Sequence, residues 1–255
     1  MKNNATVIAL SGKGGVGKTS ISAAIVKLLV QSYPDKKILA IDADPAVGLS
    51  TALGIEVPMT VDDIRREIVQ AASGGQTQAA IELLGDARYR IFDALTETAG
   101  FAFLAVGRPE SAGCYCKVNG YLKEVIGILC DAFDYVVIDG EAGIEQINRR
   151  VMEKVTHLLL VTDASKKGIQ VICSIKQVAD ELVMYKKIGA IVNRIPDGCM
   201  LSPLDIRDIP VLSCIPTDPD LLIYDIEGKI ITGLPDDSRV IAGTRQALMK
   251  MEILP

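Results

Sequence analysis

The chain has 255 residues, with 27 Lys and Arg set against 32 Asp and Glu, so its net charge is −5 at pH 7. This acidic balance argues against nucleic acid as a partner, because unspecific binding to nucleic acid depends on basic contacts to phosphates. No apolar run approaches the roughly 20 residues of a membrane span, and residues 1–9 lack a leader-peptide pattern. We therefore expect a cytoplasmic protein without stable membrane insertion.

The first half of the chain alternates short apolar runs with helical patterns. Residues 6–10 (TVIAL) predict a buried parallel strand, and Thr60 and Asp63 have the spacing of a capping box that opens a helix. Residues 73–100 predict a further helix and an irregular stretch. The strands predicted here are residues 6–10, 37–41, 101–106 and 135–138, and the other helices are residues 18–31, 60–72 and 118–130.

The second half continues this alternation to the end of the chain. Its predicted strands are residues 156–161, 188–192 and 211–214, and its predicted helices are residues 167–185, 218–224 and 237–251. Alternating strands and helices with apolar strands predict the α/β class, with a mostly parallel sheet covered by helices on both faces. The sequence has no linker and no internal repeat, so residues 1–255 are expected to form a single domain.

The strongest motif is residues 12–19 (GKGGVGKT), which fits the phosphate-binding loop G-x-x-x-x-G-K-[ST] between a strand and a helix. Glycines let successive N–H groups point at phosphates, and the following helix adds its positive N-terminus. Lys18 would reach the β- and γ-phosphates, and the Thr19 hydroxyl would ligate Mg²⁺. The sequence therefore predicts binding of ATP, ADP and Mg²⁺. The expected nucleotide-binding residues in the loop are Gly12, Gly14, Gly15, Val16, Gly17, Lys18, Thr19 and Ser20.

Acidic residues follow two of the predicted strands. Asp42 and Asp44 end the strand at residues 37–41, and Asp139 ends the strand YVVI. Ligands bind at the carboxyl ends of strands in open α/β sheets, and an acid at the end of an apolar strand is the usual second Mg²⁺ ligand of phosphate-loop proteins. We therefore predict that Asp139 holds Mg²⁺. The alternative is that these acids cap the helices that follow the strands.

Two of the six cysteines, Cys114 and Cys116, lie one residue apart in a Gly-flanked stretch that leads into a helix. Two ligands rarely hold a metal alone, but a symmetric dimer would bring two such pairs together into a four-sulfur site. Thiolates suit Zn²⁺, Cu⁺ or Fe–S clusters, and Ni²⁺ if the site can flatten. The alternative is a pair of unrelated reduced thiols. With His157 as the only histidine, catalytic machinery built on histidine is nearly excluded.

The extra lysine of the loop, Lys13, gives it the form KGGVGKT. This loop resembles the deviant Walker A loop of the MinD/ParA/nitrogenase-iron-protein class. The resemblance implies that Lys13 crosses a dimer interface to the partner's nucleotide, and that Asp44 orients the attacking water. We thus expect Lys13, Lys18 and Asp44 to be catalytic. The resemblance also places Asn193, at the end of a late strand, and the segment that begins at Pro216 beside the adenine.

Three further stretches extend the resemblance over essentially the whole chain. They are RPESAGCYCKVN at residues 108–119, DGEAGIEQINR at residues 139–149 and TDASKKG at residues 162–168. All three resemble the CooC-type nickel-insertion ATPases, which are maturation factors of carbon monoxide dehydrogenase. The resemblance implies a MinD-like fold, an ATP-dependent homodimer, and Ni or Zn bound at its interface by Cys114 and Cys116. It also implies a client nickel enzyme, carbon monoxide dehydrogenase or acetyl-CoA synthase.

Other members of the class offer alternative functions. Nitrogenase iron proteins carry a cluster cysteine shortly after the second acidic switch, but the residues after Asp139 hold no cysteine there. ParA-type ATPases bind DNA through basic surface, which the acidic balance disfavours. MinD-type regulators use a basic amphipathic C-terminal helix on membranes, whereas residues 246–255 contain one Lys and one Glu.

Overall fold

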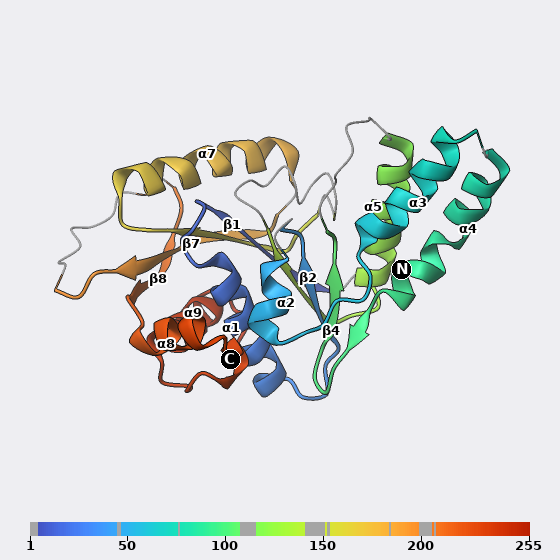
Figure 1. Cartoon of the computed structure of the whole chain (residues 1–255). Coiled ribbons are helices and arrows are strands. Elements are labelled where there is room, and N and C mark those ends of the chain that lie inside the picture. Colours follow the sequence, from blue (N-terminus) through green and yellow to red (C-terminus); the bar gives the residue numbers. More distant parts are fainter. Residues whose placement is uncertain are drawn as a thin grey trace.

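The computed structural model of the chain is built around one twisted sheet (Figure 1). The structure describes residues 5–44, 47–75, 77–107, 116–140, 151, 154–183, 185–198, 206 and 208–255. Within these residues the sheet has eight strands in the order β3-β4-β2-β5-β1-β6-β7-β8. The strands are β1 (Thr6–Gly12), β2 (Ile38–Asp42), β3 (Thr96–Glu97), β4 (Ala102–Ala105), β5 (Tyr135–Asp139), β6 (His157–Thr162), β7 (Lys187–Ile195) and β8 (Val211–Pro216).

The first strand lies in the middle of the sheet, where it pairs in parallel with both β5 and β6. The pairing places Leu10 opposite Asp139 on one side and Gly12 opposite Val161 on the other. All neighbouring strands are parallel except β3 and β4, which pair antiparallel at one edge. Because parallel strands end at the same edge, the loop after β1 and the acids that end β2 and β5 meet there.

Helices cover both faces of the sheet, because apolar side chains of its strands point alternately to either side. On β1, Val7 and Ala9 belong to the core under α3, α4, α5 and α7, while Ile8 and Leu10 belong to the core under α1, α2 and α9. The helices are α1 (Lys18–Ser32), α2 (Gly48–Leu53), α3 (Val61–Ser73), α4 (Thr77–Asp93), α5 (Cys116–Cys130), α7 (Lys166–Leu182), α8 (Pro219–Glu227), the 3-10 helix η1 (Ile231–Gly233) and α9 (Arg239–Lys250).

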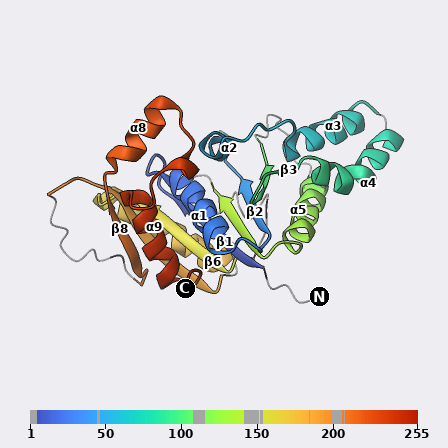
Figure 2. The ribbon, with the colours of Figure 1, turned by 90° about the horizontal axis from the view of Figure 1, so that it is seen from below.

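The helices α3, α4 and α5 gather at the β4 end of the sheet, while α8 and α9 lie at the β8 end (Figure 2). Asp218 begins α8, because its carboxylate accepts hydrogen bonds from the N–H groups of Asp220 and Leu221. Its other oxygen accepts from the N–H of Val240, so the same residue ties α9 to the start of α8.

The structure confirms the predicted α/β class and the mostly parallel sheet with helices on both faces. Residues 73–100 contain the predicted further helix, α4, and also the short strand β3, which the sequence did not indicate. The six-residue helix α2 was likewise not predicted. No helix among the described residues is both long enough and apolar enough to cross a membrane.

Candidate functional site

The loop between β1 and α1 wraps around an open space, and its glycines make this course possible. Gly15 and Gly17 have φ angles of 75° and 89°, in the left-handed region that side chains disfavour. A Cβ on Gly12 would lie 2.0 Å from the carbonyl oxygen of Val161 on the neighbouring strand. Gly17 precedes α1 and provides no side-chain cap, so the N–H groups of the first turn can donate hydrogen bonds to a bound anion.

The space inside the loop is a pocket of about 470 Å³. Its lining includes the lysine and the hydroxyl groups at the start of α1, together with a carboxylate from the end of β2. The lining residues are Gly14, Gly15, Gly17, Lys18, Thr19, Ser20, Asp44 and Arg194. Seven of these eight are residues that the sequence analysis selected for nucleotide binding or catalysis, and Arg194 is the exception.

Two side chains at the end of β7 brace the loop from behind. Asn193 is 3% exposed and donates from Nδ2 to the carbonyl oxygen of Val16 at 2.8 Å. Arg194 donates from Nη1 to the carbonyl oxygen of Gly15 at 2.6 Å. A Cβ on Gly17 would lie 2.7 Å from Nδ2 of Asn193, so this contact requires glycine. The structure thus places Asn193 against the loop backbone, and it does not place this residue in the lining of the pocket.

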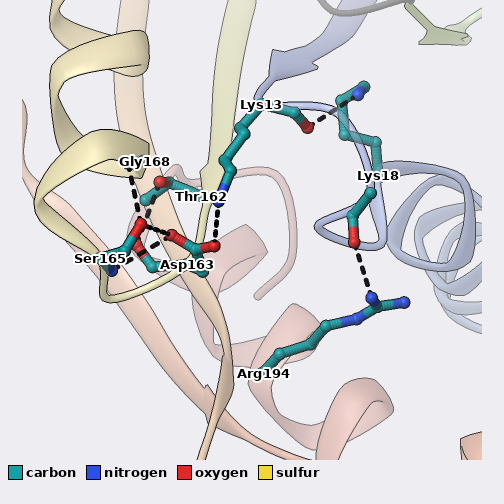
Figure 3. Close-up of polar contacts among 8 residues, drawn as sticks. Lys13, Lys18, Thr162, Asp163, Ser165, Gly168 and Arg194 are labelled. Atoms are coloured by element: carbon teal, nitrogen blue, oxygen red, sulfur yellow. Dashed lines mark hydrogen bonds and ion pairs between the residues drawn. The ribbon is translucent and has the colours of Figure 1, made fainter.

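The side chain of Lys13 points away from the phosphate loop and toward the turn after β6 (Figure 3). Its Nζ lies 2.5 Å from Oδ2 of Asp163, and Ser165 donates to the same carboxylate. Burial raises the pKa of Asp163, but the hydrogen bonds from Lys13 and Ser165 outweigh that effect and hold it below its usual value. Lys18 donates to the carbonyl oxygen of Lys13 at 3.1 Å. The two lysines of the loop therefore have different surroundings.

Asp139 ends β5 beneath the loop and is 1% exposed. Its Oδ1 accepts a hydrogen bond from the Ser22 hydroxyl at 2.9 Å, while its Oδ2 has no hydrogen-bond partner of normal geometry among the described residues. Burial raises the pKa of Asp139 to about 6. The hydrogen bonds from Thr19 and Ser22 and the charge of Lys18 lower this pKa, but they offset only part of the effect of burial. A buried carboxylate oxygen that accepts no hydrogen bond of normal geometry from the described residues, together with the nearby Thr19 hydroxyl, is a donor set that fits Mg²⁺.

Asp42, at the end of β2, is a fully buried carboxylate that organises the loop after it. Its Oδ1 accepts from the N–H of Asp44 at 3.1 Å and its Oδ2 from the N–H of Leu49 at 2.8 Å. Burial, together with repulsion from Asp139, raises its pKa to about 7. Asp42 therefore fixes the backbone that carries Asp44 to the edge of the pocket.

The two predicted thiolate ligands come just before α5 and at its first residue in the sequence. Cys114 lies outside the described residues, and Cys116 begins α5 with only its backbone described. Within the described part of the chain, no group of three His, Cys, Asp or Glu side chains could hold a metal ion. Pro216 ends β8, where it pairs with Ile195, and it does not line the pocket.

Among the residues at this site that the sequence analysis did not select are Arg194 and Asp163. Both follow strands β7 and β6 at the same edge as the phosphate loop. Position after a parallel strand was the available signal, but such positions also hold ordinary turn residues.

A parallel sheet with a phosphate loop after its central strand defines a P-loop nucleotide-binding protein. Comparison with known proteins gives the particular family. Residues 7–231 match the CobQ/CobB/MinD/ParA nucleotide binding domain, so the chain belongs to this family.

Several relatives resemble the chain over most of its length. An uncharacterized ATP-binding protein of Methanocaldococcus jannaschii is 37% identical over 92% of this chain and 93% of its own. The carbon monoxide dehydrogenase accessory protein CooC of Rhodospirillum rubrum is 29% identical over 87% of each. The septum site-determining protein MinD of Pyrococcus horikoshii, complexed with Mg-ADP, shares the fold, with a TM-score of 0.69 at 24% identity over 97% of this chain and 96% of its own.

Proposed function

We propose that this chain is a cytoplasmic Mg²⁺-dependent ATPase that works as a homodimer and assists nickel insertion into a metalloenzyme. The pocket inside the phosphate loop supports the ATPase part of the proposal, because Lys18, Thr19 and Asp44 line it together with three glycines of the loop. The nickel part rests on two supports, the pair Cys114 and Cys116 in the sequence and the likeness to a carbon monoxide dehydrogenase accessory protein.

Nucleotide binding follows from the charges and donors of the loop. The backbone N–H groups of residues 14–17 and the uncapped start of α1 would hold the phosphates, and Lys18 would add a positive charge beside them. Thr19 and Asp139 would hold Mg²⁺, which, when bound, neutralises charge on the β- and γ-phosphates. Asn193 and the segment at Pro216 would lie near the adenine, with Asn193 also bracing the loop.

Hydrolysis requires a water molecule aligned with the γ-phosphorus and the bridging oxygen of ADP. Asp44 lies at the edge of the pocket and would orient this water by accepting one of its hydrogen bonds. The water oxygen forms the new bond to phosphorus as the bond to ADP breaks, and the water proton leaves with inorganic phosphate. Positioning of this kind accounts for much of the catalysis of phosphoryl transfer.

Dimerisation supplies the last catalytic group. In this structure Lys13 is paired with Asp163 of its own chain, at 2.5 Å. In the dimer, Lys13 would leave Asp163 and reach the phosphates of the partner's nucleotide. Nucleotide can drive this exchange only if ATP and ADP prefer different dimer geometries. A change in the dimer would then alter the spacing of the two cysteine pairs and, with it, the affinity for the metal cargo.

The proposal is tested by metal content and mass measured together. The protein is purified without oxygen, loaded with Ni²⁺ or Zn²⁺ in the presence of Mg-ADP or Mg-ATP, and compared with the variant Cys114→Ser/Cys116→Ser. We expect one metal ion shared by a pair of chains in the wild type and none in the variant. Absence of thiol-dependent metal in every nucleotide state would disprove the metal-insertion role, while the ATPase would remain.

A second candidate function is an ATPase switch that acts on protein, membrane or DNA. It is favoured by the likeness to the septum site-determining protein MinD of Synechocystis, which is 26% identical over 89% of this chain. Sedimentation with anionic liposomes or with DNA, each with ATP and with ADP, separates the two candidates. ATP-dependent sedimentation without thiol-bound metal would favour this second function. An iron–sulfur cluster in the purified protein would instead favour an ATP-dependent reductase.

A further inference from the structure

A buried ion pair lies within α3, outside the nucleotide pocket. Arg65 and Asp62 on α3 are only 7% and 6% exposed, and their Nη1 and Oδ1 atoms lie 3.3 Å apart. Nε of Arg65 donates to Oδ1 of Asn119, on the first turn of α5, at 2.8 Å. Removing charged groups from water is unfavourable, so a buried pair of this kind suggests a specific role.

The same end of α3 also holds the chain that leaves β4. The N–H of Asp62 donates to the carbonyl oxygen of Val106 at 2.9 Å. Gly107 has a φ angle of 83°, and a Cβ there would lie 2.7 Å from Oγ1 of Thr60. The first turn of α3 therefore contacts the chain at residues 106–107 and again, through Arg65, at Asn119. These two points flank the stretch that contains the two neighbouring cysteines in the sequence.

Val106 connects this arrangement to the nucleotide pocket. Its N–H donates to the carbonyl oxygen of Asp42 at 2.8 Å, and the carboxylate of Asp42 accepts from the N–H groups of Asp44 and Leu49. A continuous series of hydrogen bonds thus runs from the loop that carries Asp44, through Asp42, Val106 and Asp62, to Arg65 and Asn119.

We propose that Arg65 is a positioning residue that couples the nucleotide pocket to the first turn of α5. A movement of Asp44 and the β2 end on nucleotide exchange changes the position of Val106 and the first turn of α3. Arg65 transmits that change to Asn119 at the start of α5. This inference rests on the proposed function, because α5 begins at Cys116, one of the two proposed metal ligands.

A purely structural role makes a different prediction from a coupling role. If Arg65 only stabilised the fold, loss of its bond to Asn119 would lower the stability equally with ADP and with ATP. If it couples the two regions, that loss removes the difference between nucleotide states, because coupling is a free energy shared by two sites. Spatial continuity alone does not demonstrate coupling, so the difference between nucleotide states is the quantity to measure.

The test uses variants at Asn119, which is exposed and so can be replaced without opening the core. Asn119→Leu removes the acceptor for Arg65, whereas Asn119→Asp keeps an oxygen there. Arg88→Met is the matched control, because Arg88 is exposed on the neighbouring helix α4 and makes no hydrogen bond or ion pair in the described part of the chain. Hydrogen exchange of the whole chain is measured over α5 with Mg-ADP and with a non-hydrolysable Mg-ATP analogue.

We expect the wild type, Asn119→Asp and Arg88→Met to show exchange rates that differ between the two nucleotides by about fivefold or more, the lower end of typical coupling between sites. Asn119→Leu should show no difference, while its affinity for each nucleotide and its dimer mass stay unchanged. A nucleotide-dependent difference that persists in Asn119→Leu overturns the inference. Absence of any difference in the wild type overturns it as well.

Zn²⁺ affinity, measured by competition with a chromophoric chelator on the same proteins, separates this inference from the proposed function. Zn²⁺ bound by the wild type in a nucleotide-dependent manner, and by Asn119→Leu without that dependence, supports both. Zn²⁺ that binds Asn119→Leu with the wild-type nucleotide dependence overturns the inference alone. In a further outcome, none of the proteins binds Zn²⁺, while the nucleotide-dependent difference in hydrogen exchange is present in the wild type and lost in Asn119→Leu. The proposed metal function then fails and the coupling through Arg65 stands.

Discussion

At the scale of single residues, the nucleotide site contains two buried carboxylates. Burial favours their protonated forms, whereas Mg²⁺ binding requires the charged form. Asp42 and Asp139 lie at the ends of adjacent strands, and burial raises the pKa of the first to about 7 and of the second to about 6. Charged carboxylates there are unfavourable in the empty protein, yet the proposed Mg²⁺ requires a charged Asp139. Perturbed acids of this kind are typical of functional sites.

These shifts predict how stability depends on pH when Mg²⁺ and nucleotide are removed with EDTA and dialysis. Between the unfolded pKa of 3.8 and the folded values, the folded state binds more protons than the unfolded state. The contribution of these two acids to the free energy of unfolding therefore falls as pH rises through this window, up to about pH 7. His157, whose pKa is lowered by burial, acts in the opposite direction.

The contribution of the two acids is isolated by comparing wild type with Asp42→Asn in urea titrations from pH 5 to pH 8. We expect the free energy of unfolding of Asp42→Asn to fall less steeply with pH than that of the wild type. The variant removes one buried acid and also its repulsion of Asp139. Equal slopes in the two proteins would mean that Asp42 has an ordinary pKa.

The glycines of the phosphate loop give a second prediction at this scale. Gly12→Ala would place a Cβ 2.0 Å from a backbone oxygen at a φ of 151°, so we expect a loss of several kcal/mol of stability or failure to fold. Gly14→Ala is the control, since its Cβ would meet no atom within 4 Å. Thermal unfolding without nucleotide should leave Gly14→Ala within about 0.5 kcal/mol of wild type, and a similar loss in both variants would contradict the steric argument.

The sequence predicted the phosphate loop and the acids after β2 and β5, because their residue types and spacing follow directly from phosphate and Mg²⁺ chemistry. It did not predict the partners of the loop. Lys13 pairs with Asp163, 150 residues away, and Arg194 contacts Gly15 from 179 residues away. An aspartate or arginine after a strand has many structural uses, so only the folded arrangement reveals these contacts.

At the scale of secondary-structure elements, α3 illustrates what a sequence specifies well. Thr60 accepts from the N–H of Asp63 at 3.2 Å, and the Asp63 carboxylate accepts from the N–H of Thr60 at 2.9 Å, which is the capping box expected from the sequence. In contrast, α2 and β3 have six and two residues. They are too short to show a period, and their formation depends on tertiary contacts.

The capping box yields a prediction for this helix. We expect Thr60→Ala to reduce the free energy of unfolding by about 0.5–2 kcal/mol, because α3 loses a hydrogen-bonded cap. Chemical denaturation of Thr60→Ala, Asp63→Ala and the double variant should give a non-additive result, since the two side chains form one unit. Ser238→Ala, at the start of α9, removes a single bond of 3.5 Å and should cost less. Strict additivity would show that the box is not cooperative.

At the scale of the whole molecule, the site is incomplete in one chain if Lys13 acts across a dimer. In this structure its ammonium group is held by Asp163, and Lys18 is the lysine that lines the pocket. A second chain would supply the missing positive charge.

The corresponding prediction concerns Lys13→Ala. We expect this variant to bind ATP but to lose hydrolysis and ATP-dependent dimerisation, measured by phosphate release and by light scattering. Asp44→Asn is the contrast, because it should dimerise with ATP and fail only in hydrolysis. Wild-type ATPase activity in Lys13→Ala would disprove a cross-subunit role.

The central position of β1 also constrains how the chain reaches its native state. This strand precedes the other seven described strands in the chain, yet its neighbours in the sheet are β5 and β6, which begin at Tyr135 and His157. Contacts between residues so distant in sequence close slowly, because the intervening chain must first lose entropy. The phosphate loop therefore precedes its supporting strands in the order of synthesis, and we expect affinity for nucleotide only after β7 has brought Asn193 and Arg194 against the loop.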